Sequence, residues 1–210
     1  RIADQGEVHG TVKLGPAQRR FFEEQSKDLH HFNQSVMLYR REGFNTDALA
    51  KVIQKIAEHH DALRLVFRQG EHGVEAWNRS LGEGELYSLQ IHDLQDEKDP
   101  ALAIEAGAEA IQRSISLEDG PLFRLGLFRC AEGEHLLIVI HHLAVDGVSW
   151  RILFEDLQEG YEQAARGEAV KLPQKTDSYR AWVDGITQYA NSPAAKQERS
   201  FWAEVEGEGF

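Results

Sequence analysis

Residues 136–147 have the sequence LLIVIHHLAVDG, in which five aliphatic residues lead directly to two histidines, a short bridge and an Asp-Gly pair. An unbroken apolar run of this length is typical of a β-strand that is covered on both faces. Successive side chains of a strand point to opposite faces, so we expect His141 and His142 to meet different surroundings. The end of this strand is the place where the sequence predicts chemistry.

The residue types after the strand suit proton transfer. A neutral imidazole accepts a proton near pH 7, and partial burial favours the neutral form because it disfavours the cation. Asp146 either orients an imidazole or pairs with an arginine, and the second role is favoured; Gly147 is expected to permit a turn with positive φ. Two buried histidines beside a purely structural turn fit the same spacing. Because adjacent strand histidines diverge, the pair is not expected to bind zinc.

The sequence on either side predicts a hairpin and a helix. Residues 121–130 and 135–142 are apolar segments separated by a length suited to a β-hairpin. Ser149 is a candidate N-cap for a helix that carries Trp150 and further apolar residues at core spacing and ends near Gly167. The positive end of this helix dipole could stabilise an oxyanion beside the histidines, although a plain packing helix is the simpler interpretation.

Strands and helices are interspersed along the rest of the chain. Strands are predicted at residues 32–40, 63–68, 74–79 and 86–92, and helices are predicted to begin at residues 16, 45–47 and 99–100. Two further amphipathic segments carry apolar residues at 179–189 and 201–205. The sequence therefore predicts an α/β or α+β fold, with helices packed on a mixed β-sheet in two layers. Two other histidine doublets, His30-His31 and His59-His60, are expected at the surface or at helix ends.

Composition narrows the class of protein. Of 210 residues, 23 are Lys or Arg and 35 are Asp or Glu, which gives a net charge of −12. This charge repels phosphate backbones and counts against a nucleic-acid partner. The single cysteine excludes an internal disulfide. With no run of 18 apolar residues and no leader pattern, we expect a cytoplasmic protein without membrane association.

Several motifs resemble those of a known family. The order HHxxxDGxSW at residues 141–150 resembles the signature of the condensation superfamily of nonribosomal peptide synthetases. HDALR at residues 60–64 resembles its HExLR-type segment, and GPAQ at residues 15–18 resembles its opening motif. Within the superfamily, FNQS at residues 32–35 and DGVSWR at residues 146–151 resemble epimerization domains more than amide-forming condensation domains.

The resemblance implies a fold and an activity. The fold would be similar to chloramphenicol acetyltransferase, with residues 1–210 as the N-terminal subdomain of an epimerization- or condensation-type domain whose C-terminal subdomain is absent. The activity would be L-to-D epimerization of the α-carbon of an aminoacyl or peptidyl thioester during nonribosomal peptide synthesis. His142 would be the general base, and an acidic residue of the missing half would be the opposing proton donor. This fragment alone is expected to be inactive.

The resemblance also implies roles and partners. His141 would orient the loop, Gly147 would allow close approach of the pantetheine or substrate carbonyl, and Asp146 would pair with Arg64 as a structural clamp. Ser149 and Trp150 would support the site. The cofactor would be a phosphopantetheine arm on a peptidyl carrier protein, with no metal; the partners would be that carrier and the missing C-terminal half.

Three alternatives remain open at this point. An amide-forming condensation domain would use the same histidine to assist attack of an amine on a thioester. A free-standing acyltransferase would use a diffusible acyl-CoA, although the acidic net charge counts against it. A non-catalytic recruitment module of the same fold would only bind other enzymes, and the intact His142 and Asp146 argue against it.

Overall fold

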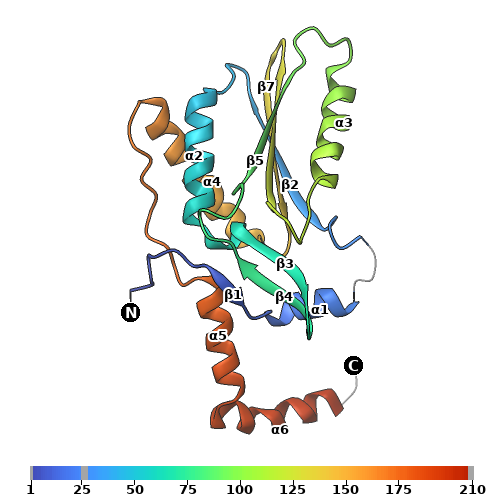
Figure 1. The fold of residues 1–210 in the computed structure, drawn as a ribbon, viewed down its shortest axis with the longest axis vertical. Coiled ribbons are helices and arrows are strands. Elements are labelled where there is room, and N and C mark those ends of the chain that lie inside the picture. Colours follow the sequence, from blue (N-terminus) through green and yellow to red (C-terminus); the bar gives the residue numbers. More distant parts are fainter. Residues whose placement is uncertain (1, 25–27, 208–210) are drawn as a thin grey trace.

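The computed structural model describes residues 2–24 and 28–207, and the predicted histidine strand lies at its centre (Figure 1). This strand is β7 (Gly133–His141), and it pairs antiparallel with β2 (Asn33–Arg40) on one side and β6 (Phe123–Cys130) on the other. The hairpin and the strand predicted at residues 32–40 are therefore confirmed. β5 (Ser88–Asp93) completes the sheet, parallel to β6, in the order β2-β7-β6-β5.

Helices cover both faces of this sheet, as the unbroken apolar run predicts. α2 (Thr46–His59) and α4 (Gly147–Ala165) lie against one face, and α3 (Pro100–Arg113) lies against the other (Figure 1). None of the five aliphatic residues at 136–140 is more than 5% exposed. The alternation of side chains along β2 agrees with this arrangement, since Asn33 donates to the carbonyl of Gln112 in α3 while Leu38 faces α2 and α4.

A second, smaller sheet lies beside the first. Its three strands are antiparallel in the order β1-β4-β3, and they are β1 (Gly10–Val12), β4 (Gly73–Asn78) and β3 (Leu65–Gly70). Residues 71 and 72 form the turn that joins β3 to β4. The strand predicted from residue 63 begins at Leu65 instead, because Asp61–Arg64 forms a single turn of 3₁₀ helix, η1. This turn decides the environment of Arg64.

The helix starts predicted at residues 16, 45–47 and 99–100 agree with the structure. α1 (Pro16–Glu24) begins at its proline, where a missing N–H costs no hydrogen bond. Asn45 caps α2 by accepting from the backbone N–H of Ala48, and Asp99 caps α3 in the same way. Within the described part of the chain, no helix combines the length and apolar character needed to cross a membrane. The observed mixed α/β architecture confirms the predicted fold class.

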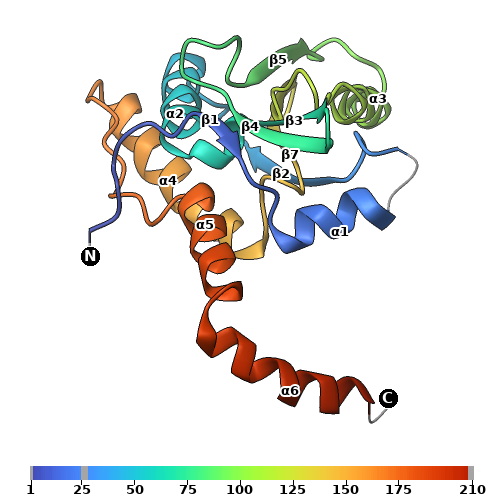
Figure 2. The same cartoon turned by 60° about the horizontal axis from the view of Figure 1, so that its bottom comes forward.

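The last two helices lead away from the sheets. α5 (Tyr179–Ala190) passes close to the start of α1, and Lys13 forms an ion pair of 3.0 Å with Asp184. α6 (Pro193–Gly207) has no buried residue, and Figure 2 shows it extending away from the rest of the molecule. Its aromatic residues Phe201 and Trp202 are 59% and 56% exposed. Packing within the described residues therefore does little to hold α6.

Candidate active site

His141, the last residue of β7, is fully buried and fixed in its neutral form. Its Nε2–H donates to the carbonyl of Leu29 at 2.8 Å, and its Nδ1 accepts from the backbone N–H of Leu143 at 3.2 Å. Burial lowers the pKa of His141 to about 4, because the interior disfavours the cation. Both ring nitrogens are engaged by the backbone, which suits a residue that orients the loop and leaves no nitrogen to exchange protons with a substrate.

His142 follows the strand and has the opposite arrangement of protons. Its Nδ1 lies 2.8 Å from the carbonyl of Val145, which can only accept, so Nδ1 carries the hydrogen and Nε2 has a free electron pair. The ring is half-buried, and the ring of Phe32 stacks on it with centroids 5.0 Å apart. The two histidines thus meet different surroundings, as strand alternation predicts, and His142 alone presents an unprotonated nitrogen without a backbone partner.

Asp146 is the N-cap of α4 and does not pair with Arg64, so the predicted clamp is wrong. Its Oδ1 accepts from the backbone N–H of Ser149 at 2.8 Å and from the Ser149 hydroxyl at 2.7 Å. These hydrogen bonds, the backbone one first, hold the pKa of the exposed Asp146 carboxyl below its usual value. The carboxylate also occupies the positive helix end, which agrees with the simpler interpretation of α4 as a packing helix.

The predicted N-cap, Ser149, lies inside α4 as its third residue. Both Asp and Ser are good N-caps, so their types do not decide between them. Asp146 has extended backbone angles at the point where the chain leaves the turn, whereas Ser149 is already helical. The helix therefore begins at Gly147, two residues after Val145, which is the last buried residue of the turn.

Arg64 is fully buried and forms its ion pair with Asp61, not with Asp146. The 3₁₀ turn η1 places the two side chains within 2.6 Å. The remaining N–H groups of the guanidinium donate to the backbone carbonyls of Val8, Ala57, Glu58 and Arg79. Because a carboxylate three residues away satisfies the buried charge, Arg64 holds the end of α2 and the small sheet together and lies outside the histidine site.

Gly147 does not have the positive φ that the sequence predicts, and it is the first residue of α4. A Cβ at this position would meet no atom within 4 Å. The chain therefore leaves open space beside Gly147, and the predicted close approach of a substrate group stays a prediction.

Gln34 is the residue of this site that the sequence analysis did not single out. Its Nε2 lies 3.2 Å from Nε2 of His142, and its Oε1 accepts from the indole Nε1–H of Trp150 at 2.8 Å. Trp150 is half-buried and stacks on Phe154 of α4, with centroids 5.4 Å apart. Strand alternation puts Gln34 on one face of β2, but only the pairing of Gln34 with Ile140 of β7 brings it to His142.

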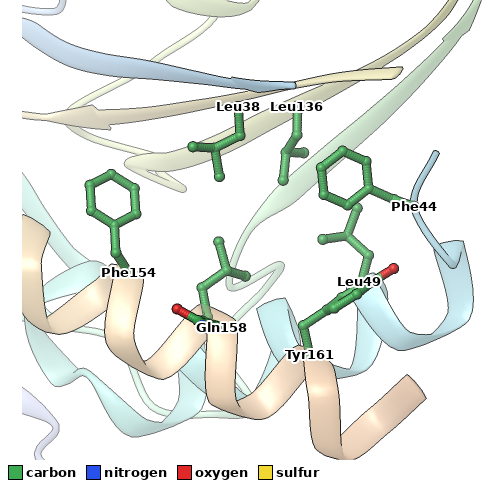
Figure 3. Close-up of a pocket in the computed structure, with 8 residues that line it drawn as sticks. Leu38, Phe44, Leu49, Leu136, Phe154, Gln158 and Tyr161 are labelled. Atoms are coloured by element: carbon green, nitrogen blue, oxygen red, sulfur yellow. The ribbon is translucent and has the colours of Figure 1, made fainter. Parts of the chain in front are cut away.

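An apolar cavity of about 280 Å³ lies between α4, α2 and the large sheet (Figure 3). Its lining residues are Leu38, Phe44, Leu49, Leu136, Phe154, Leu157, Gln158 and Tyr161. His142 is not among them, and the lining offers no group that titrates near neutral pH. Phe154, on which Trp150 stacks, connects the lining of the cavity to the histidine site.

A second group of titratable side chains joins α2 to α4. Nε2 of His60 lies 2.7 Å from Oδ2 of the buried Asp156, and one atom from each of His59, His60 and Asp156 lies within 4.8 Å of the others. Burial and then the charge of His60 lower the pKa of His59. His59 ends α2 and His60 is its C-cap, which confirms the predicted helix-end position of this doublet.

Comparison with known sequences places the chain in a family. The family described as Condensation domain matches residues 8–209. The chain is 50% identical over 206 residues to a mycosubtilin synthase polypeptide of Bacillus subtilis, and 44% identical over 208 residues to tyrocidine synthase 1 of Brevibacillus parabrevis. These alignments cover 98% and 99% of this chain but only 8% and 19% of the two relatives.

Solved structures agree with the fold. The epimerization domain from the third module of tyrocidine synthetase B superimposes with a TM-score of 0.94 at 42% identity, covering 97% of this chain and 46% of that chain. The starter condensation domain of rhizomide synthetase superimposes with a TM-score of 0.79 at 20% identity, which shows a shared fold, and 48% of that chain is covered. This chain thus spans less than half of either solved chain. It belongs to the condensation-domain family of nonribosomal peptide synthetases.

Proposed function

We propose that residues 1–210 are the N-terminal half of an epimerization domain, which converts the α-carbon of an aminoacyl or peptidyl thioester from L to D. The observation that carries this proposal is the unprotonated Nε2 of His142, at the end of a buried strand and without a backbone partner. The 42% identity to a solved epimerization domain, against 20% to a solved starter condensation domain, supports the choice within the family.

The proposed reaction begins with transfer of the α-proton to Nε2 of His142. The electron pair of the broken C–H bond moves toward the thioester carbonyl and gives an enolate, while the new imidazolium keeps its Nδ1–H on the carbonyl of Val145. Return of a proton to the opposite face of the α-carbon completes the inversion, so an acid must face His142 across the substrate. We assign that acid to the C-terminal half of the domain. A positioned base or acid contributes about 10²- to 10⁴-fold each.

The substrate is proposed to arrive as a thioester on the phosphopantetheine arm of a peptidyl carrier protein. The exposed segment from Asp146 to Val148 lies next to His142 and leaves room for such an arm, since a Cβ on Gly147 would meet no atom of the chain within 4 Å. Thioesters suit this chemistry because their α-protons are more acidic than those of amides or free carboxylates.

The central test is L-to-D conversion by the synthetase module that contains this chain. With its carrier loaded with an L-aminoacyl thioester, the wild-type module is expected to form the D-isomer. Since the substituted side chain would be the base, His142→Ala is expected to lower the initial rate by at least about 10²-fold. His72→Ala, in the exposed turn between β3 and β4, is a matched control and is expected to leave the rate unchanged. The rate is measured by chiral chromatography of the released amino acid.

The same assay separates the alternatives. Conversion by His142→Ala at the wild-type rate would contradict the assigned base. If the module forms an amide bond to an acceptor and no D-isomer, the domain is an amide-forming condensation domain, which the name of the matching family makes the second candidate. Absence of both products from the wild-type module would favour a recruitment role.

A further inference from the structure

The side-chain amide of Gln34 lies between Trp150 and His142, and its orientation is determined from both ends. An indole N–H can only donate, so the oxygen of the Gln34 amide must face Trp150, 2.8 Å away. The NH₂ group then faces Nε2 of His142 at 3.2 Å, and that nitrogen is an acceptor because Nδ1 carries the hydrogen. The hydrogen bonds therefore run in one direction, from Trp150 through Gln34 to the base.

These contacts join the two segments that resemble epimerization domains, residues 32–35 and 146–151. Gln34 comes from β2 and Trp150 from the first turn of α4, and both are half-buried. Strand pairing and helix packing hold them independently of one another. The convergence on His142 of two segments more than 100 residues apart suggests a function in the reaction beyond packing.

Proton transfer changes what the Gln34 amide can bind. Once Nε2 of His142 has taken the α-proton, it has no free electron pair and cannot accept from Gln34. At the same moment the thioester oxygen gains negative charge as the enolate forms. A near-attack geometry places the α-carbon about 3–3.5 Å from Nε2, and the carbonyl oxygen is two bonds further. The structure therefore allows that oxygen to approach the NH₂ group that Nε2 releases.

We propose that Gln34 is a catalytic residue whose amide donates to Nε2 of His142 before reaction and to the thioester oxygen as the α-proton is transferred, with Trp150 as its positioning residue. This inference rests on the proposed epimerization. The bond that breaks is the Cα–H bond, the proton goes to His142, and the hydrogen bond from Gln34 moves to the oxygen that receives the electron pair. Before reaction the same hydrogen bond holds the ring of His142 in a fixed orientation.

The test compares substitutions of Gln34 in the complete module loaded with an L-aminoacyl thioester. Gln34→Leu removes the donor, and Gln34→Glu, of nearly the same shape, replaces it with an oxygen that cannot donate as a carboxylate. Both are expected to lower kcat by about 10²-fold with little change in KM, as loss of one oxyanion donor does elsewhere. Exchange of the α-proton with D₂O is expected to slow in parallel. Gln54→Leu, the same change on the exposed surface of α2, is the control.

Trp150→Phe tests the positioning step. It keeps an aromatic ring that can stack on Phe154 and removes only the indole N–H, so a smaller loss of kcat is expected, about 10-fold, for one neutral hydrogen bond. If Gln34→Leu fails to fold, Gln34→Glu and Trp150→Phe still test whether the amide of Gln34 contributes to kcat. Wild-type kcat in folded Gln34→Glu, or a loss confined to KM, would overturn the inference. Absence of D-isomer and of α-proton exchange in the wild type would instead contradict the proposed epimerization itself.

Discussion

His141 and His142 are neighbours in sequence, yet they carry their hydrogens on different nitrogens. The backbone decides this difference, because Leu29 and Val145 offer carbonyls that only accept, one to Nε2 of His141 and the other to Nδ1 of His142. His141 is therefore fixed by two backbone contacts, and His142 by one. An unprotonated Nε2 on a half-buried ring is what a general base requires.

The stability of the chain is predicted to depend on pH through His141. Its pKa is lowered from 6.5 to about 4 in the folded protein, so the unfolded chain binds more protons between these values and stability falls as the pH falls through them. Between pH 7 and 4.5 this residue is expected to cost about 2 kcal/mol of folding free energy. Urea unfolding of the wild type and of His141→Gln at pH 7 and at pH 4.5 measures this loss of unfolding free energy.

The Gln variant is expected to lose less stability than the wild type over this range, although its stability at pH 7 is lower. The lowered pKa of Asp146 acts at more acid pH, since its stabilisation is lost only below its usual value near 3.8. Equal losses in wild type and variant would show that His141 is not a buried neutral group.

At the scale of elements, the turn between β7 and α4 connects a buried strand to a helix whose first turn lies at the surface. Asp146 ends this turn by capping α4, and the carbonyl of Val145 just before it holds His142. The cap and the histidine contact come from adjacent residues. Correct placement of the helix start therefore helps to fix the orientation of the base.

Substitution of Asp146 separates capping from chemistry. Asp146→Asn keeps an oxygen that can accept from Ser149, so unfolding free energy and L-to-D conversion are both expected to stay near wild type. Asp146→Ala removes the cap and is expected to cost about 1 kcal/mol. Urea unfolding of the chain and the conversion assay of the module give the two quantities. Loss of conversion in a stable Asn variant would show that the reaction needs the negative charge.

At the scale of the whole molecule, the chain is a well-packed pair of sheets that ends in weakly packed helices. The large sheet is covered on both faces, whereas α6 extends away from the rest of the molecule (Figure 2). This helix buries no residue, and its Phe201 and Trp202 are exposed. Large exposed aromatic residues on one helix are typical of a surface that another part of a protein covers. This exposure agrees with the proposal that these residues belong to half of a domain.

Hydrogen exchange is predicted to separate α6 from the rest of the chain. In the isolated 210 residues, the amides of α6 are expected to exchange fast because few tertiary contacts oppose local opening, while those of β7 are expected to be strongly protected. In the complete module, α6 is expected to gain protection and β7 to change little. Deuterium uptake, measured by mass spectrometry, is compared between the isolated 210 residues and the complete module. Equal uptake by α6 in both samples would argue against a covering second half.

Local patterns in the sequence determined much of this fold. The aliphatic run at residues 136–140 predicted a strand buried on both faces, and strand alternation predicted diverging histidines. Pro16, Asn45 and Asp99 marked the starts of three helices, because capping depends on residues within one turn. The family and fold class could also be recognised, since their motifs are contiguous in the chain.

The tertiary structure alone decided which partners meet. Asp61 and Asp146 were both available to Arg64, and Asp146 and Ser149 could both cap α4; the 3₁₀ turn and the exit angle of the loop decided each case. Gln34 became part of the site only through the register of β2 against β7 and the packing of α4. Sequence spacing carries information over about one helical turn or along one strand, whereas contacts between segments 100 residues apart depend on how the elements pack.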